Sequence, residues 1–218
     1  MVYRIQSSRN KEITGVNDVQ SETAFSPINI WDPLHINQWI GKEIPDYAVI
    51  PIPKIKIKAK LTDLMSVYFF GSSFKLTISN KLKLILEKYS RDKIQYVPIV
   101  MQQAGKQVNG YWLTNILDFD NDKIDFSGSE IVSRNYPLDS GYLVKIKDYG
   151  EYLDQKKKIE FPYNLYFQKI AIRSDVTEKM FMLEKVYGGI GYYVSESLKK
   201  ILDAEGCTGI EYSSIEQG

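Results

Sequence analysis

Apolar and polar residues alternate along much of the chain, a pattern typical of β-strands with one buried face. The alternation is clearest at 95–102 and 110–117, which Ala104-Gly105-Lys106 joins as a predicted hairpin. Further strands are expected at 142–147, 165–173 and 181–187. The pattern therefore predicts more strand than helix.

The segment 44–58 also alternates, but three prolines interrupt its first part. Because proline cannot donate to a β-ladder, we expect this segment to be an edge strand or an extended cover. Four lysines lie on the face opposite its isoleucines, at Lys54, Lys56, Lys58 and Lys60. They are typical of a solvent-exposed strand edge, and contact with an acidic partner is the alternative.

Two short helices are predicted in the first third of the chain. One begins at Asp32-Pro33 and ends at Gly41, because proline suits a first helical turn and glycine suits a helix end. It would turn Trp31, Leu34, Trp39 and Ile40 toward the core. The other covers 62–65, with Thr62 as its N-terminal cap.

The chain contains an internal repeat. Residues 74–86 align with 190–202 without a gap, at the constant offset of 116 that separates Ser79 from Ser195. The match includes Leu82 with Leu198, and it continues beyond the helices to Ile94 with Ile210, Tyr96 with Tyr212 and Ile99 with Ile215. In each copy a short apolar strand ends at the serine, whose oxygen caps the following helix.

These observations predict a mixed, strand-rich α+β fold. Two repeated strand, serine-capped helix and strand units lie near residues 74–99 and 190–215. Residues 1–26 are polar and are expected to be an irregular N-terminal arm with at most one short strand. Residues 27–218 are expected to form one α+β domain or two closely packed lobes, with a boundary between 100 and 140.

Composition narrows the functional classes. The chain has 218 residues and a net charge of +1, and this near-neutral balance disfavours specific binding of nucleic acid or of any other phosphate backbone. Cys207 is the single cysteine, so no internal disulfide forms and a reducing compartment is natural. The N-terminal residues lack an apolar signal-peptide core, and no apolar stretch is long enough to span a membrane. We expect a cytoplasmic protein.

The sequence offers little catalytic chemistry. His35 is the only histidine and lies between two tryptophans, which favours a packing or surface role over general acid–base catalysis. Cys207 lies in a predicted turn, and there is no cluster of cysteine and histidine for zinc. Ser79 and Ser195 are interpreted as caps. We therefore predict no catalytic, cofactor-binding or metal-binding residues, and no cofactor.

An acidic stretch covers residues 118–125. Its carboxylates resemble the start of a calcium loop, but Lys123 and Ser129 stand where the loop needs glycine and glutamate. A solvent-exposed loop is one reading. The other is an acidic contact surface for a basic partner, formed by Asp118, Asp120, Asp122 and Asp125.

Several short motifs along the chain together match the pattern of a known protein family. In the first half these are Thr62-Asp63-Leu64, Ile78-Ser79-x-x-Leu82 and Tyr96-x-Pro98-Ile99. The central motif is Tyr111-Trp112-Leu113-x-Asn115-Ile116, followed by Asp125 and Ser127. The C-terminal motifs are Val194-Ser195-Glu196-x-Leu198-Lys199 and Thr208-Gly209-Ile210-Glu211-Tyr212. Together these motifs resemble immunity family eleven of the bacterial polymorphic-toxin systems. The resemblance spans residues 28–215, and the chain departs from the family in its polar N-terminal arm and its lysine-rich 155–158 segment.

The resemblance implies a cytoplasmic protein that binds a cognate toxin and protects the cell that makes it. The family brings no catalytic residues, which agrees with the reading of the residues above. Two other hypotheses stay open. One is an enzyme that uses carboxylates or tyrosines in a pocket between two lobes, and the other is a structural or assembly component. A monomer or a small homo-oligomer is expected.

Overall fold

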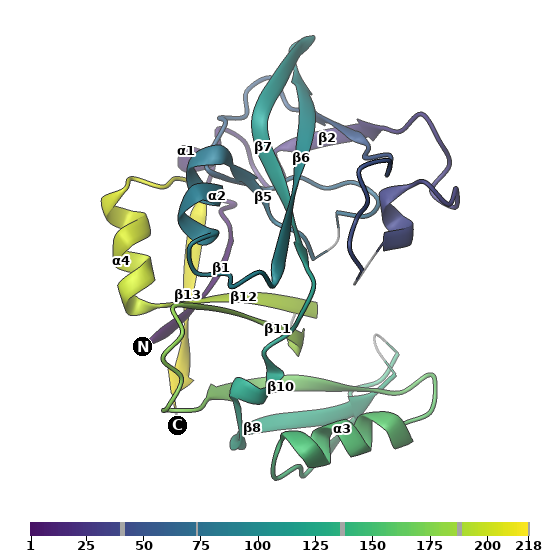
Figure 1. Cartoon of the computed structure of the whole chain (residues 1–218), viewed down its shortest axis with the longest axis vertical. Helices are drawn as coiled ribbons and strands as arrows, with labels where there is room; N and C mark the ends of the chain where they lie inside the picture. The colour runs from purple at the N-terminus through teal and green to yellow at the C-terminus, as the bar shows by residue number, and fades with distance from the viewer. Residues whose placement is uncertain (40–41, 73, 136–137, 187–188, 218) are drawn as a thin grey trace. The chain divides into compact units, whose positions relative to one another are not determined.

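The computed structural model describes residues 1–39, 42–72, 74–135, 138–186 and 189–217 (Figure 1). The strands are β1 (Val2–Ser7), β2 (Ser21–Phe25), β3 (Ile52–Ile55), β4 (Leu64–Met65), β5 (Thr77–Ser79), β6 (Ile94–Gln103), β7 (Lys106–Ile116), β8 (Ile124–Arg134), β9 (Tyr142–Val144), β10 (Asn164–Ile172), β11 (Met180–Val186), β12 (Gly189–Ser195) and β13 (Ile210–Gln217). The helices are α1 (Lys11–Thr14), α2 (Asn80–Leu86), α3 (Tyr149–Lys158) and α4 (Glu196–Ala204), with the 3-10 helices η1 (Ile36–Trp39) and η2 (Asn121–Lys123). The predicted strand-rich α+β class is confirmed.

The chain divides into two compact units, and neither is continuous in sequence. Unit 2 consists of Ile5–Asp118 and Lys199–Tyr212, and unit 1 contains Met1–Arg4, Phe119–Leu198 and the residues from Ser213 onward. The chain passes from one unit to the other within β1, α4 and β13, and also between Asp118 and Phe119. The last of these crossings lies in the range where a boundary was expected.

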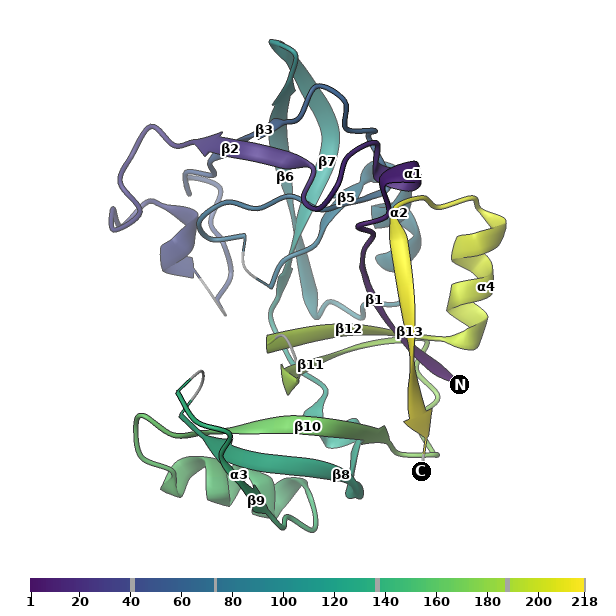
Figure 2. The same ribbon diagram turned by 180° about the vertical axis from the view of Figure 1, so that it is seen from behind.

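Unit 2 is built on a six-stranded sheet with the order β2-β3-β6-β7-β5-β4. The hairpin β6–β7 runs through its middle with the predicted turn at Ala104-Gly105 (Figure 2). Its apolar core combines inward-facing residues of the sheet with Ile36 of η1. Trp39, from the same 3-10 helix, packs against this core. The alternation read from the sequence therefore marks the buried face.

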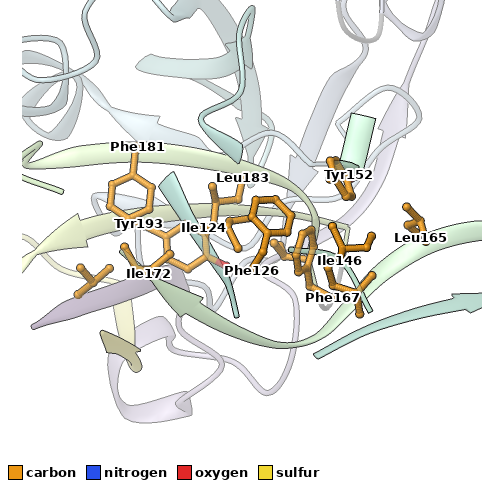
Figure 3. Packing of buried hydrophobic residues seen from close by; sticks show 13 residues of the cluster. Ile124, Phe126, Ile146, Tyr152, Leu165, Phe167, Ile172, Phe181, Leu183 and Tyr193 are labelled. Atoms are coloured by element: carbon orange, nitrogen blue, oxygen red, sulfur yellow. The ribbon is translucent and has the colours of Figure 1, made fainter. Parts of the chain in front are cut away.

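Unit 1 is built mainly on a seven-stranded sheet with the order β11-β12-β1-β13-β10-β8-β9. Its core is rich in aromatic rings, and Figure 3 shows Phe126, Tyr152 and Phe167 packed together beside the pair Phe181 and Tyr193. The rings of Phe181 and Tyr193 are stacked with centroids 5.4 Å apart. Helix α3 lies beside β8 and β10 in both ribbon views and contributes Tyr152 to this core.

The two sheets repeat one architecture. Read from the other end, the first sheet has the order β4-β5-β7-β6-β3-β2, and the second has β11-β12-β1-β13-β10-β8 followed by β9. Strand β3 pairs with β6 in parallel, as β10 does with β13, while β2 and β8 pair antiparallel with β3 and β10. The repeat found in the sequence is therefore part of a longer structural duplication.

The strand registers agree as well. Leu64 pairs with Ile78, and Met180 pairs with Val194, which are the same positions after the offset of 116. Ser79 N–H donates to the Asp63 carbonyl, and Ser195 N–H donates to the Lys179 carbonyl at the same offset. The predicted caps are confirmed, because the Ser79 and Ser195 hydroxyl oxygens accept the N–H groups of Leu82 (3.2 Å) and Leu198 (3.3 Å).

Strand β1 fills, in the second copy, the place that β7 fills in the first. Ser8, just after β1, donates to the Gly209 carbonyl at 2.8 Å, and Glu196, just after β12, donates to the Met1 carbonyl at 3.0 Å. β1 therefore runs antiparallel to both neighbours, as β7 does between β5 and β6. The start of the chain thus completes the sheet of the copy at its end.

Asp63 ties the first helix cap to the turn between α4 and β13, within unit 2. Its carboxylate accepts the Ser79 hydroxyl at 2.6 Å and the Thr208 N–H at 2.9 Å, and Lys81 lies 3.5 Å away. Burial alone raises the pKa of Asp63, but the hydrogen bonds from Ser79 and Thr208, with the Lys81 charge, outweigh it and lower the pKa. Gly209 cannot carry a side chain here, because a Cβ would lie 2.2 Å from the Leu64 carbonyl oxygen.

Several local predictions are wrong. The segment 62–65 is not a helix, because Leu64 pairs with Ile78 in β4 and the Thr62 hydroxyl donates to the Leu64 carbonyl. The predicted helix at 32–41 is reduced to η1, with Trp31 and Leu34 exposed, while Ile40 and Gly41 lie outside the described residues.

The N-terminal arm also differs from expectation. Residues 1–26 contain β1, α1 and β2, and Asn10 caps α1 by accepting the Glu12 N–H at 2.8 Å. Because β2 adds to the outer side of β3, the strand in 44–58 is not at the edge of the sheet, and Pro53 pairs with Ala24. Lys54, Lys58 and Lys60 are exposed, as expected of the lysine stripe.

The position of β1 predicts that it can be moved to the other end of the chain. We expect a variant that starts at Ser8 and carries residues 1–7 after Gln217, through an inserted Asn-Gly turn, to fold with a loss below about 2 kcal/mol. Urea denaturation followed by circular dichroism measures this. Deleting residues 1–7 outright is the control and should abolish folding, because it removes an internal strand. A permuted chain as unfolded as the deletion would contradict the assignment.

Candidate binding surface

Asp120, predicted as part of an acidic surface, is a buried structural residue. Its N–H donates to the Met182 carbonyl at 2.7 Å, and its carboxylate accepts the Met182 N–H at 3.0 Å. In the first copy Gln20 makes the same pair of bonds to Ser66, both at 2.7 Å. Ser66 and Met182 are related by the offset of 116, so the two residues have equivalent roles.

The next residue extends the same contact in both copies. Ser21 accepts the Tyr68 N–H at 2.9 Å, and Asn121 accepts the Glu184 N–H at 2.9 Å. We call these two segments, Gln20–Ser21 and Asp120–Asn121, the clamps. The first clamp joins the start of β2 to the chain that follows β4, and the second joins the segment before β8 to β11. In the first sheet, β2 and β4 lie at opposite ends of the strand order.

The other predicted acidic residues differ from Asp120 in their surroundings. Asp118 is exposed in unit 2, with a carboxylate oxygen 3.2 Å from Lys93 Nζ. Asp122 is exposed in unit 1. The Asp125 carboxylate accepts hydrogen bonds from the Ser127 hydroxyl and N–H. These bonds lower the pKa of the Asp125 carboxyl, and the bond from the hydroxyl has the larger effect. Asp120 therefore belongs to the interior, and partner contact by the other three stays a prediction.

The remaining chemical candidates are also buried or half-buried. His35 is fully buried, its Nδ1 accepts the Asn37 N–H at 3.1 Å, and burial lowers its pKa. Burial raises the pKa of Cys207 to about 11, so the thiol stays protonated at neutral pH. Across the described ranges, no group of three or more histidine, cysteine, aspartate or glutamate side chains is placed to hold a metal ion.

Large aromatic side chains are exposed along residues 21–72 of unit 2. Among the described residues of this stretch, five rings have 58–75% of their surface exposed: Phe25, Trp31, Tyr47, Tyr68 and Phe70. We call these five residues the aromatic surface. Exposed aromatic groups are enriched at protein–protein contact sites, because a ring gives a large apolar contact with few torsions to order.

The segments that carry these rings are tied to one another. The clamp bond from Tyr68 to Ser21 joins the chain after β4 to β2, which ends at Phe25. Gly71 packs directly on η1, since a Cβ there would lie 2.7 Å from Ile36 Cγ2. The Tyr68–Phe70 segment thus bridges β2 and η1.

The connection from β2 to β3 is held in the same way. Val49 N–H donates to the Leu34 carbonyl at 2.7 Å, which ties the Tyr47 segment to the turn after Trp31. The rings of Tyr47 and Trp39 meet edge to face with centroids 6.1 Å apart. The exposed rings therefore lie on segments that are hydrogen-bonded to neighbouring parts of unit 2.

Acidic side chains accompany this surface. Residues 17–50 include five carboxylates and a single lysine, and Glu22, Glu43 and Asp46 among them are exposed. Residues 17–50 therefore carry a local negative charge, whereas the exposed Lys54, Lys58 and Lys60 follow them along the chain. Beside residues 17–50, a partner with basic groups would be favoured electrostatically.

No protein-family model matches this chain, and a search of curated proteins finds no match. In the part of the chain that the structure describes, none of the helices has the length and apolar character that crossing a bilayer requires.

The clamp predicts that two nearby aspartates differ in their contribution to stability. Asp120→Ala leaves the buried Met182 N–H without its acceptor and should lower the free energy of unfolding by about 1–3 kcal/mol. The matched variant Asp122→Ala changes an exposed residue and should stay within about 0.5 kcal/mol of wild type. Urea denaturation of the three chains compares them. Equal stabilities for both variants would show that the Asp120 clamp contributes nothing.

Proposed function

We propose that this protein neutralises a cognate bacterial toxin by direct protein–protein contact in the cytoplasm, and that the aromatic surface is where the toxin binds. The observation that carries the proposal is the exposure of five large rings on tied segments of unit 2. The resemblance to immunity family eleven supports a toxin as the class of partner. The negative bias of residues 17–50 supports a partner with a basic contact face.

The energetics favour a partner on this surface. Covering an exposed aromatic side chain contributes about 1.5–3 kcal/mol, so a few of these rings supply the central part of a stable interface. Trp31 is the most exposed of the five. Tryptophan and tyrosine are also the residues that most often dominate binding energy in protein interfaces.

The direct test uses the chain as bait in a lysate of the bacterium that encodes it, followed by co-expression of the captured partner. A single stoichiometric partner that kills a host unless this protein is present is the expected result. We expect Trp31→Ala to weaken that complex about 30-fold or more, because central aromatic anchors are worth about 2 kcal/mol. Isothermal titration calorimetry measures the change.

Phe161→Ala is the matched control. Phe161 is also exposed, but it lies in unit 1 and outside the aromatic surface, so this variant should bind like wild type. If Trp31→Ala binds like wild type while Phe161→Ala does not, the toxin contacts unit 1 instead. Co-purification of only further copies of this chain would favour the assembly hypothesis and refute toxin binding.

A further inference from the structure

The second copy carries a helix over the clamped end of its sheet. Lys156 of α3 forms an ion pair with Glu184 of β11, the residue whose N–H the clamp holds. From the same helix, Tyr152 packs its ring 5.6 Å from the rings of Phe126 and Phe167. Helix α3 therefore packs on the core and contacts the clamped strand at Glu184.

The equivalent place in the first copy is uncovered. Tyr68 corresponds to Glu184, since both N–H groups are held by their clamps, and it is 60% exposed. Two residues further on, Phe70 is 58% exposed, whereas its counterpart Val186 is 1% exposed. The connection in this copy packs η1 on the core but leaves both rings in solvent.

We propose that a basic amphipathic helix of the partner docks on Tyr68 and Phe70, by analogy with α3, which contacts Glu184 in the second copy. This inference rests on the proposed function, and it names the chemistry of the segment that binds. Helix α3 is the template on which the inference is based. It presents aromatic rings on its packed side and three lysines in its last turn.

Charge supports the same occupant. Glu22 lies in β2 beside the first clamp, and Glu43 and Asp46 lie in the connection that follows η1, all of them exposed. A helix with lysines at its C-terminal end meets these carboxylates favourably, and those lysines also suit the negative end of its own helix dipole. An acidic or uncharged apolar helix lacks this attraction.

The probe is a helix-stapled synthetic peptide with the sequence of residues 146–160 of this chain, added to the full-length protein. We expect it to shift the amide NMR signals of 21–25 and 66–72. A peptide with Lys156, Lys157 and Lys158 replaced by glutamate should bind more weakly by a factor of about ten or more.

The matched protein variant is Tyr68→Ala with Phe70→Ala, which removes both exposed rings and leaves the charge of the surface unchanged. Both positions are exposed, so urea denaturation should show an unchanged fold, and peptide affinity should fall about tenfold or more. Unchanged affinity, equal binding of both peptides, or signal shifts confined to unit 1 would each overturn the inference.

The captured partner separates this inference from the function beneath it. If the Tyr68→Ala, Phe70→Ala variant captures the partner with wild-type affinity, the docking site is wrong and the proposed function stands. If it loses the partner while Phe161→Ala keeps it, the docking site is supported. If wild type itself captures no toxin, the proposed function fails and the inference falls with it.

Discussion

The fold depends on two short polar clamps that occupy the backbone groups of a strand end. An outermost strand leaves N–H and C=O groups without partners, and these groups attract further strands. Gln20 and Asp120 take both backbone groups of Ser66 and Met182, and the following residue in each clamp holds the next outward-facing amide. The clamps therefore close the sheet of each copy at the same point. They also fix Tyr68 on the outside of unit 2.

Local signals in the sequence predicted the elements that depend on local chemistry. Ser79 and its helix were predictable, because a capping serine followed by apolar residues at helical spacing marks the start of a helix through contacts within one turn. The clamps were not, because Gln20 and Asp120 differ in residue type and bond to residues 46 and 62 positions away. The same long-range pairing placed β1 in the second sheet. Pairing with Ile78 also made a strand of Leu64–Met65, in the segment where a threonine cap favoured a helix.

The candidate surface was only partly predictable for a related reason. An acidic run such as 118–125 reads as solvent-exposed from its composition, yet Asp120 turns inward because Met182 needs an acceptor. Aromatic rings suit the core and the surface equally well, so the sequence alone could not assign Trp31 or Tyr68 to solvent. The two copies share one framework and differ in what covers it, and that difference marks Tyr68 and Phe70.

Hydrogen–deuterium exchange of the full chain, alone and with its captured toxin, shows whether a protein partner covers the aromatic surface of unit 2. We expect exchange at 21–36 and 66–72 to be slower in the complex, with the backbone of α3 and β9 unchanged. If protection is confined to unit 1 and residues 66–72 exchange at the rate of the free protein, the toxin does not cover this surface.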